Sequence, residues 1–557
     1  MKVDLTRLLD HARDVTHLAV SERMEVLSLG APVEAETGER TVVSAEALRG
    51  LDVWEAARVL HDTYAGDVAF VIRTPSALAV VRPPFSELPI YYWRDQDTLR
   101  VWSGLASPKA LLDTPPDFDL DYLAGVLLNP AWQTPATGLD GVSELLSGGV
   151  LVHDGTQPRQ VDLLAEAVLR LATAEAETGD YDEQVAKFHR LILKSVRHKT
   201  EQDPQGFSIN CSGGLDSTVV TVAAAELYPE RRLPLLNSYS EEDPHGDERY
   251  FFNAVSERVR GSPVLVETHA RSSRSGLSSE LLMATPRPCK LSGTVATTGQ
   301  LYAAARANGS RIVLSGDGGD QLFLRNSRAL FSRELMGEAD SPSAALRAMA
   351  GVAIQDRCSF WRVAREALTG TMVRRYRHHF FGELRFPRSP LSEGDIPEED
   401  LVPHGARLAG LSTSRAFQYF GMRNAEMNRI GFKACPIDER KPFVFWPLIR
   451  AALAARREHH LAEGRDRALE RDAFKKQIPR IIYDRMGKGA GRDILVRFDY
   501  DALAAGLLTS PVCEYELVSR ERLHKLLRHE DRIDEDTAFA LVGARAIADW
   551  MELYERA

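Results

Sequence analysis

The sequence predicts an α/β protein in two parts: a β-rich α+β domain and then a doubly wound parallel-sheet domain with many helices. Residues 1–170 contain short β-branched and aromatic runs, such as Asp67–Arg73 and Ile90–Trp93, bounded by glycine, proline and polar turns. Beyond this region, apolar runs alternate with helical segments, which predicts right-handed crossovers and parallel strands. We therefore place the second domain at residues 180–557, after the polar, acidic stretch 173–183.

The second domain is expected to begin with four strands connected by helices. From about residue 325 to the end, the pattern is mostly helical. The predicted strands are Phe207–Asn210, Leu233–Ser240, Pro263–Glu267 and Arg311–Leu314, and the predicted helices between them are Thr218–Leu227, Asp247–Arg260 and Gln300–Ala307.

Composition excludes several classes of function. The chain has 557 residues, 44% of them hydrophobic and 27% charged, as in ordinary globular proteins. It has no apolar stretch of about 18 residues that could span a membrane, and its polar N-terminus is unlike a secretory signal, so we expect a cytoplasmic protein without membrane contact. The net charge of −10 speaks against nucleic-acid binding. Five scattered cysteines without a CxxC pair argue against a disulfide framework or a zinc site.

A glycine loop lies directly after the first predicted strand of the second domain and opens a helix. Backbone N–H groups at a helix N-terminus favour an anion, and two adjacent glycines let a phosphate come close. The loop lacks the lysine of a Walker A sequence, so a P-loop ATPase is excluded. An aspartate inside a phosphate loop needs a neutralising cation, which makes Asp216 a candidate Mg²⁺ ligand. The predicted pyrophosphate-binding residues are Ser212, Gly213, Gly214, Leu215, Asp216 and Ser217.

A second loop, residues 314–320, follows the fourth predicted strand and contains Asp317 and Asp320. Parallel sheets bind ligands beyond the carboxyl ends of their strands, so both loops should face one crevice. The alternative for each loop is a tight Gly/Asp turn without a ligand.

At these two loops the chain resembles the asparagine synthetase family, whose synthetase domains carry SGGxDS and, on a later strand, SGxGxD. The resemblance extends to Gly66–Phe70, Trp102–Ser107 and Leu145–Gly149, which are similar to segments of the family's glutaminase domain. It continues at Arg440–Phe443 and at Arg485–Lys488. It implies a glutaminase-like (Ntn-type) first domain and a nucleotide-pyrophosphatase-like synthetase second domain.

The family's glutaminase uses an N-terminal cysteine, but residue 2 here is Lys2 and no cysteine precedes Cys211. Glutamine hydrolysis is therefore not expected, and the first domain reads as a retained scaffold. Ammonia would not be the nucleophile, so the amine must come with the substrate.

The resemblance then points to cyclising or amine-ligating branches. Beta-lactam synthetases have a tyrosine at the variable position of SGxGxD and a glutamate downstream. Here these positions are Asp317 and, by counting back from Lys441, Glu426. The missing cysteine, the SGDGGD variant and the helical insert Phe360–Arg388 are most similar to lasso peptide cyclases, which close a macrolactam between a peptide's N-terminal amine and an Asp or Glu side chain.

The resemblance implies a mechanism of adenylation by ATP followed by attack of the amine. Asp216 and Asp320 would share Mg²⁺, while Ser238, Ser315 and Gly316 would lie at the adenosine pocket. Lys488 would stabilise charge on the phosphate and on the tetrahedral intermediate; the alternative is a surface lysine in a flexible loop.

Proton transfer from the amine is assigned to Glu426, tuned by Asp317. The alternative for Glu426 is a helix carboxylate that pairs with Arg423 or Arg429.

Three functions remain open from the sequence. The first is a lasso peptide cyclase acting on a precursor core peptide, with a leader-binding protein and a leader peptidase as companions implied by the resemblance. The second is a small-molecule amide ligase or beta-lactam-type synthetase. The third is a non-catalytic homologue that binds nucleotide or peptide.

Overall fold

The computed structural model of the chain describes both predicted parts. The described residues are 2–6, 8, 15–95, 98–105, 108–112, 114–128, 133–155, 157–173, 179–241, 246–268, 282–288, 295–325, 332–339, 341–370, 410–429, 431, 437–485 and 498–556.

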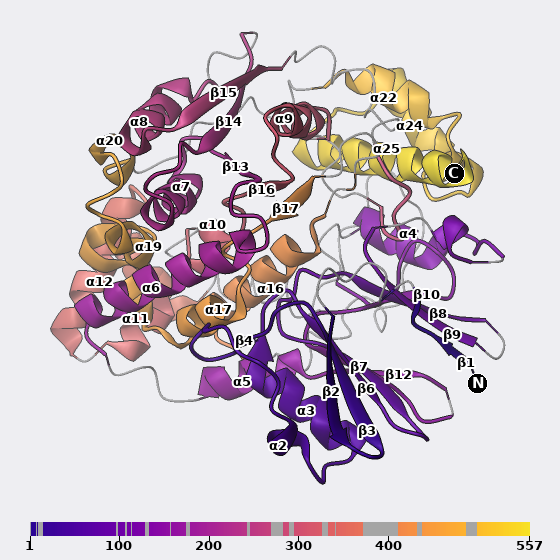
Figure 1. Cartoon of the computed structure of the whole chain (residues 1–557). Coiled ribbons are helices and arrows are strands. Elements are labelled where there is room, and N and C mark those ends of the chain that lie inside the picture. Colours follow the sequence, from indigo (N-terminus) through magenta and orange to yellow (C-terminus); the bar gives the residue numbers. More distant parts are fainter. Residues whose placement is uncertain are drawn as a thin grey trace.

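Two sheets form the first part of the molecule (Figure 1). The larger is antiparallel, in the order β12 (Arg159–Asp162), β11 (Gly149–His153), β7 (Leu78–Arg82), β6 (Ala69–Arg73), β3 (Met24–Leu29) and β2 (Val15–Ser21). The smaller has the order β1 (Lys2–Asp4), β9 (Thr98–Ser103), β8 (Ile90–Asp95) and β10 (Val142–Leu145), with β1 parallel to β9. A short pair, β4 (Val33–Glu34) and β5 (Tyr64–Ala65), stands apart.

Helices cover the outer faces of both sheets. Successive side chains of a strand point to opposite faces, so Phe70 of β6 packs with α3 (Val53–Thr63), whereas Val71 packs into the core between the two sheets. On the far side of the smaller sheet, Trp102 shares a core with α4 (Leu120–Leu128). The layers are therefore helix, sheet, sheet and helix. The likeness to a glutaminase domain and the boundaries 1–170 and 180–557 stay predictions.

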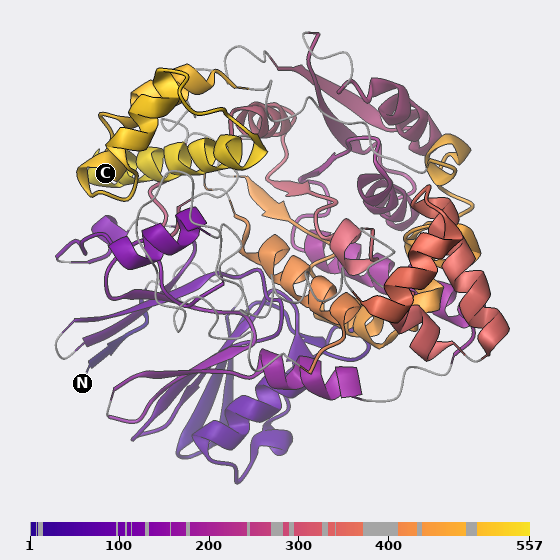
Figure 2. The same ribbon diagram turned by 180° about the vertical axis from the view of Figure 1, so that it is seen from behind.

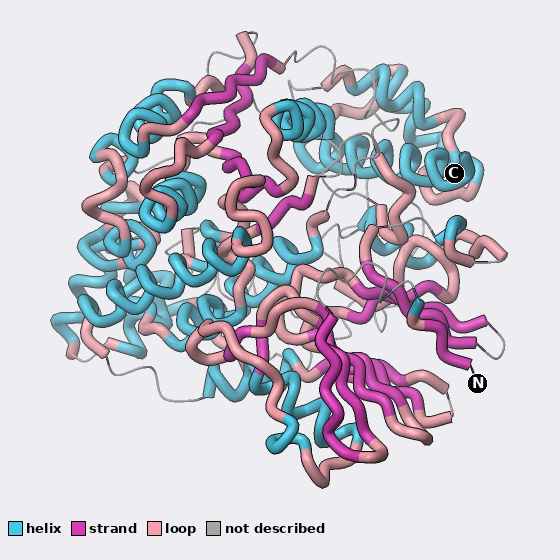
Figure 3. The backbone as a smooth tube through the Cα atoms, viewed as in Figure 1, coloured by secondary structure: helices cyan, strands magenta, loops and turns pink. Residues whose placement is uncertain are grey.

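The second part is built on a five-stranded sheet, all parallel, which is magenta in the upper half of Figure 3. Its order is β15 (Ser262–Glu267), β14 (Pro234–Tyr239), β13 (Phe207–Asn210), β16 (Ile312–Leu314) and β17 (Asp438–Arg440). The four predicted strands and their parallel pairing are confirmed. The fifth strand, β17, was missed because Asp438-Glu439-Arg440 has low intrinsic strand propensity and is held by its pairing with β16.

Both faces of this sheet are covered by helices. Leu235 of β14 packs with α6 (Tyr181–Thr200), α7 (Leu215–Leu227) and α8 (Arg249–Val259) in one core. Its neighbour Leu236 packs with α9 (Val295–Ala307) and α25 (Glu535–Arg556) in another. The doubly wound architecture predicted from the strand–helix alternation is thus present.

The remaining helices surround this sheet, and those between residues 332 and 370 lie at the periphery (Figure 2). They are α2 (Ala45–Leu48), α5 (Leu164–Thr173), α10 (Gly319–Leu322), α11 (Ser332–Glu338), α12 (Pro342–Gln355), α13 (Phe360–Thr369), α16 (Thr413–Met427), α17 (Trp446–Ala454), α18 (Arg457–His460), α19 (Ala468–Ala473), α20 (Arg480–Tyr483), α22 (Tyr500–Leu507), α23 (Pro511–Glu514) and α24 (Arg520–Leu527), with 3-10 turns at Pro108–Ala110 and Ala462–Gly464.

The two parts pack directly against each other. The Phe85 and Trp446 rings stack with centroids 5.8 Å apart. Gly66 has a φ of +99°, and a Cβ there would lie 2.9 Å from the ring of His198 on α6, so glycine is required for this contact. The next amide, that of Asp67, donates to His198 Nε2 at 3.1 Å.

Candidate active site

The first glycine loop leads from β13 into the thirteen-residue helix α7. Gly213 has a φ of +80°, and a Cβ there would lie 2.8 Å from both the Phe251 Cβ and the Phe252 backbone nitrogen. Gly214 is the N-cap of α7 and offers no side chain to the first turn. The loop therefore leaves the N-terminal end of a buried helix open to an anion, as the sequence predicted.

Hydroxyl groups hold this loop in shape. The Ser212 and Ser217 oxygens lie 3.2 Å apart, and the Gly214 amide donates to Ser212 Oγ at 3.2 Å. The Leu215 side chain is buried in the core, so this residue can offer only its backbone to a ligand.

The second loop leads from β16 into α10 and touches the first. A Cβ on Gly316 would lie 2.6 Å from the Ser217 nitrogen, and one on Gly319 would lie 2.8 Å from the Asp216 side chain. Since β13 and β16 are adjacent, and the chain leaves them in opposite directions across the sheet, both loops lie at its topological switch point. The predicted proximity of the two loops is therefore confirmed, and a common crevice between them stays a prediction.

Asp216 and Asp320 converge on one cation. Arg467 Nη1 lies 2.5 Å from Asp216 Oδ1 and 2.6 Å from Asp320 Oδ1, and Arg325 binds the other Asp320 oxygen at 2.9 Å. Two carboxylates within reach of one positive group, beside a phosphate-type loop, fit Mg²⁺, which takes one or two protein carboxylates together with substrate phosphates. Among the described residues no cluster of three acidic, histidine or cysteine ligands is found.

The other predicted binding residues lie around this crevice. The Ser315 amide donates to the Arg440 carbonyl at 3.0 Å, and its hydroxyl accepts from the Asp317 amide at 3.1 Å. Asp317 is exposed, and Ser238 lies on β14, next to β13.

The family model for asparagine synthase matches residues 187–552 of the chain. This span covers more than half of the sequence and includes both glycine loops. The chain belongs to the asparagine synthase family. It is accordingly an ATP-dependent, adenylating amide-bond ligase.

Other comparisons add little to this assignment. An NMN synthetase from Francisella tularensis is 16% identical over 27% of this chain and 60% of its own, with a TM-score of 0.19, which supports no argument about fold or function. No curated protein matches the chain. Within the described residues of this family member, no helix is both long and apolar enough to cross a membrane.

Glu426, the predicted general base, lies in a buried network of ion pairs. It is buried on α16, where it accepts from Arg82 and Arg429 and, at 3.0 Å, from Ser147 Oγ. The role of Glu426 as general base stays a prediction. The alternative, in which Glu426 pairs with Arg423 or Arg429, agrees with the ion pairs in the structure. The residue is buried, however, and does not lie on a helix surface.

A different carboxylate lies near Asp317. Glu439 of β17 accepts from the Tyr302 hydroxyl, and the charge of Asp317 acts on both groups. Burial, and to a lesser degree Asp317, raises the pKa of Glu439. Sequence reasoning passed over this residue although it directly precedes Arg440–Phe443.

Two more residues of the site were missed. Arg467 is the cation between Asp216 and Asp320, and Glu470, one turn later on α19, is fully buried. Neither Glu470 oxygen has a hydrogen-bond partner among the described residues, and burial together with Asp216 raises its pKa well above the usual value. The available sequence signal was the spacing of three residues between Arg467 and Glu470, which places them at the N-cap and in the first turn of α19. Lys488 lies outside the described residues, so its role stays a prediction.

Proposed function

We propose that this family member is a lasso peptide cyclase, which adenylates an Asp or Glu side chain of a precursor core peptide and closes a macrolactam with the peptide's N-terminal amine. The carrying observation is the pair of glycine loops whose Asp216 and Asp320 meet at one cation position. The lack of any cysteine among the first 210 residues supports an amine that comes with the substrate.

In the first step, a substrate carboxylate oxygen attacks the α-phosphorus of ATP, and the bond to the bridging oxygen breaks to release pyrophosphate. The open N-terminus of α7 at Gly213 and Gly214 receives the pyrophosphate oxygens. Asp216 and Asp320 would hold Mg²⁺, which would neutralise charge on these phosphates. Arg467 would have to release at least one of these two aspartates to admit the metal, and its guanidinium could then face the phosphates.

In the second step, the amine attacks the acyl carbon; the C–N bond forms, and the C–O bond to AMP breaks. The ammonium must lose its protons on the way. Glu426, tuned by Asp317, is the predicted acceptor, and Asp317 itself, at the exposed edge of the second loop, is a second candidate. Lys488 is the predicted donor to the developing negative charge.

A leader-binding protein and a leader peptidase are proposed companions, since a cyclase needs a core peptide with a free amine.

A small-molecule amide ligase is the second candidate. It is favoured by a pocket of about 320 Å³ between the two parts of the molecule, which is near the lower end of the range for small-molecule sites.

The test is mass spectrometry of a linear synthetic peptide, with a free N-terminal amine and an internal Asp or Glu, incubated with the protein, ATP and Mg²⁺. Loss of one water from the peptide together with AMP formation is the expected result. An N-acetylated copy of the same peptide is the control and should not lose water. A peptide that stays linear while small amino acids stimulate AMP formation would support the second candidate instead.

A further inference from the structure

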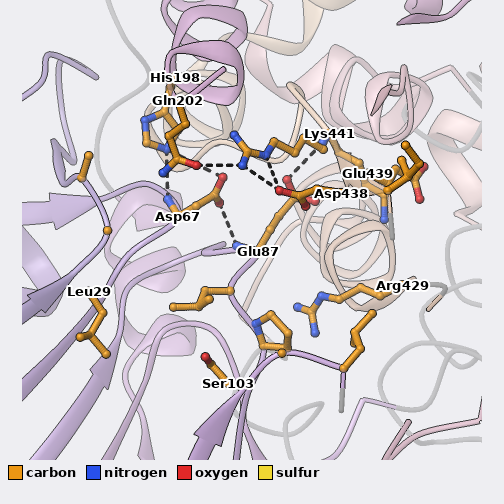
Figure 4. A pocket seen from close by; sticks show the side chains of 18 of the residues that line it. Leu29, Asp67, Glu87, Ser103, His198, Gln202, Arg429, Asp438, Glu439 and Lys441 are labelled. Atoms are coloured by element: carbon orange, nitrogen blue, oxygen red, sulfur yellow. Dashed lines mark hydrogen bonds and ion pairs between the residues drawn. The ribbon is translucent and has the colours of Figure 1, made fainter. Parts of the chain in front are cut away.

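The pocket between the two parts of the molecule has a volume of about 320 Å³ and is open on one side. Figure 4 shows that Leu29, Asp67, Glu87 and Ser103 line one wall, whereas Asp438, Glu439 and Lys441 line the other. The pocket therefore reaches from the first domain to β17, the strand beside the second glycine loop.

Most charges in the pocket are already paired. Lys199 Nζ lies 2.8 Å from Asp67 and 2.6 Å from Glu87. Arg440 binds Asp438 at 2.7 Å.

The cations at the inner wall are engaged as well. Lys441 Nζ donates to the Ala425 carbonyl at 2.8 Å and to the Asn428 carbonyl. Arg429 binds Glu144 at 3.1 Å and also Glu426. These groups are consequently held in place. Glu144 and Glu426 balance the charge of Arg429, whereas Lys441 is fixed by two carbonyl groups and keeps its positive charge.

Glu439 differs from its neighbours. Its hydrogen-bond partner is neutral, the Tyr302 hydroxyl. The charge of Lys441 acts on it as well, but no ion pair joins Glu439 to a cation within the described part of the chain. It lines the pocket and pairs in register with Val313, two residues before Ser315, so it lies on the strand beside the one that leads into the second glycine loop. A half-buried carboxylate without a bound cation is an acceptor for a ligand's ammonium group.

The rest of the wall is largely apolar. Its aliphatic side chains come from both parts of the molecule and leave room for a hydrocarbon group of the ligand. They are Leu8, Leu29, Ala31, Leu88, Leu105 and Ile437.

We propose that this pocket binds the amine-bearing end of the substrate, a primary ammonium group next to a small apolar side chain, with Glu439 receiving the ammonium. The proposal rests on the proposed function, in which the substrate supplies its own amine. In this proposal the first domain has a role in substrate binding, because the first domain and β17 together line the cavity that receives the amine.

The test is direct binding without ATP, by saturation-transfer difference NMR, of leucinamide and of N-acetyl-leucinamide at a pH where leucinamide is protonated. Leucinamide should bind and the acetylated compound should not. Glu439→Gln should weaken leucinamide about tenfold, because a charge-assisted hydrogen bond is replaced by a neutral one. Asp438→Asn makes the same charge change in the same pocket, at a carboxylate that Arg440 already neutralises, and should change binding less than twofold.

Leu105→Trp places a larger side chain in the apolar part of the pocket and should abolish binding. Thermal melting checks that each variant is folded. Equal binding of the two compounds would overturn the proposal, and so would equal effects of Glu439→Gln and Asp438→Asn. Because no nucleotide is present, these outcomes are independent of the proposed function. A chain that forms AMP yet does not bind leucinamide would refute only the pocket assignment.

Discussion

Two pairs of carboxylates in this molecule bind arginine, and they differ in how completely arginine neutralises them. Glu144 and Glu426 are fully buried and together face four guanidinium groups, those of Arg82, Arg287, Arg423 and Arg429. Asp216 and Asp320 are 9% and 21% exposed and share one nitrogen of Arg467, while Arg325 binds the other oxygen of Asp320.

The excess of positive charge locks the first pair. Burial alone would raise the pKa of Glu144, but the charges of Arg287, Arg429 and Arg82 hold that pKa well below its usual range. The second pair faces two guanidinium groups, Arg467 and Arg325, and so lacks this excess of positive charge. The comparison teaches that a carboxylate's counter-ions, more than its burial, separate a structural acid from a candidate metal ligand.

Removing Glu426, a member of the first pair, should have the largest effect. Glu426→Ala removes one of the two carboxylates that Arg82 and Arg429 share and leaves both arginines, still buried, with Glu144. We therefore expect a loss of about 3–5 kcal/mol in the free energy of unfolding. Urea unfolding measures it, with the exposed helix residue Glu257→Ala as control, expected within about 0.5 kcal/mol of wild type. Equal free energies of unfolding for the two variants would show that this ion-pair network does not stabilise the fold.

Removing Asp216, a member of the second pair, should instead affect catalysis. Asp216→Ala should slow AMP formation by about 10²–10³-fold while leaving the fold intact, because the charge on the phosphates loses a partner. The control, Asp501→Asn on α22, should retain wild-type rates. Unchanged AMP formation in Asp216→Ala, measured by chromatography, would contradict the assignment.

Buried histidines are a third case, because the groups around them do not offset the effect of burial, which disfavours the protonated ring. Burial lowers the pKa of His198 to about 4 and that of His460 to about 3. Between pH 6.5 and these values only the unfolded chain binds the proton, so stability should fall on acidification and be flat above pH 6.5. Each histidine should cost about 2 kcal/mol between pH 6.5 and 5.

Thermal melts across this pH range measure the loss, and His198→Gln should remove about half of the slope. A slope that this variant leaves unaltered would show that His198 is not buried as a neutral ring.

The smallest expected effect concerns the arginine that occupies the cation position. Arg467→Gln should tighten Mn²⁺ binding about tenfold without ATP, since the metal no longer displaces a charged hydrogen-bond donor. Electron paramagnetic resonance titration measures it. Arg325→Gln, which affects only the other oxygen of Asp320, is the matched control with a smaller change. Equal or weaker binding in Arg467→Gln would mean that the arginine does not compete with the metal.

The parts of this structure that follow local rules could be predicted from the sequence. Apolar runs between helices located β13 to β16, and glycines at positions of close approach, such as Gly213 and Gly316, located the crevice. These signals are local because a strand needs apolar residues and a tight loop needs glycine.

The parts that depend on tertiary pairing could not be predicted. β17 is a charged tripeptide that becomes a strand only beside β16, and Arg467 reaches Asp216 across 251 positions of sequence. Glu426 binds Arg82, and counting along the chain could not reveal this contact because the two residues are 344 positions apart.

The most direct test of the account uses a substrate whose carboxylate is labelled with ¹⁸O, together with ATP and Mg²⁺. If the carboxylate attacks the α-phosphorus, cleavage of the acyl C–O bond leaves one labelled oxygen on AMP, and mass spectrometry should find it there. Label in inorganic phosphate, with ADP as the other product, would contradict adenylation and with it the role assigned to the crevice of Asp216 and Asp320.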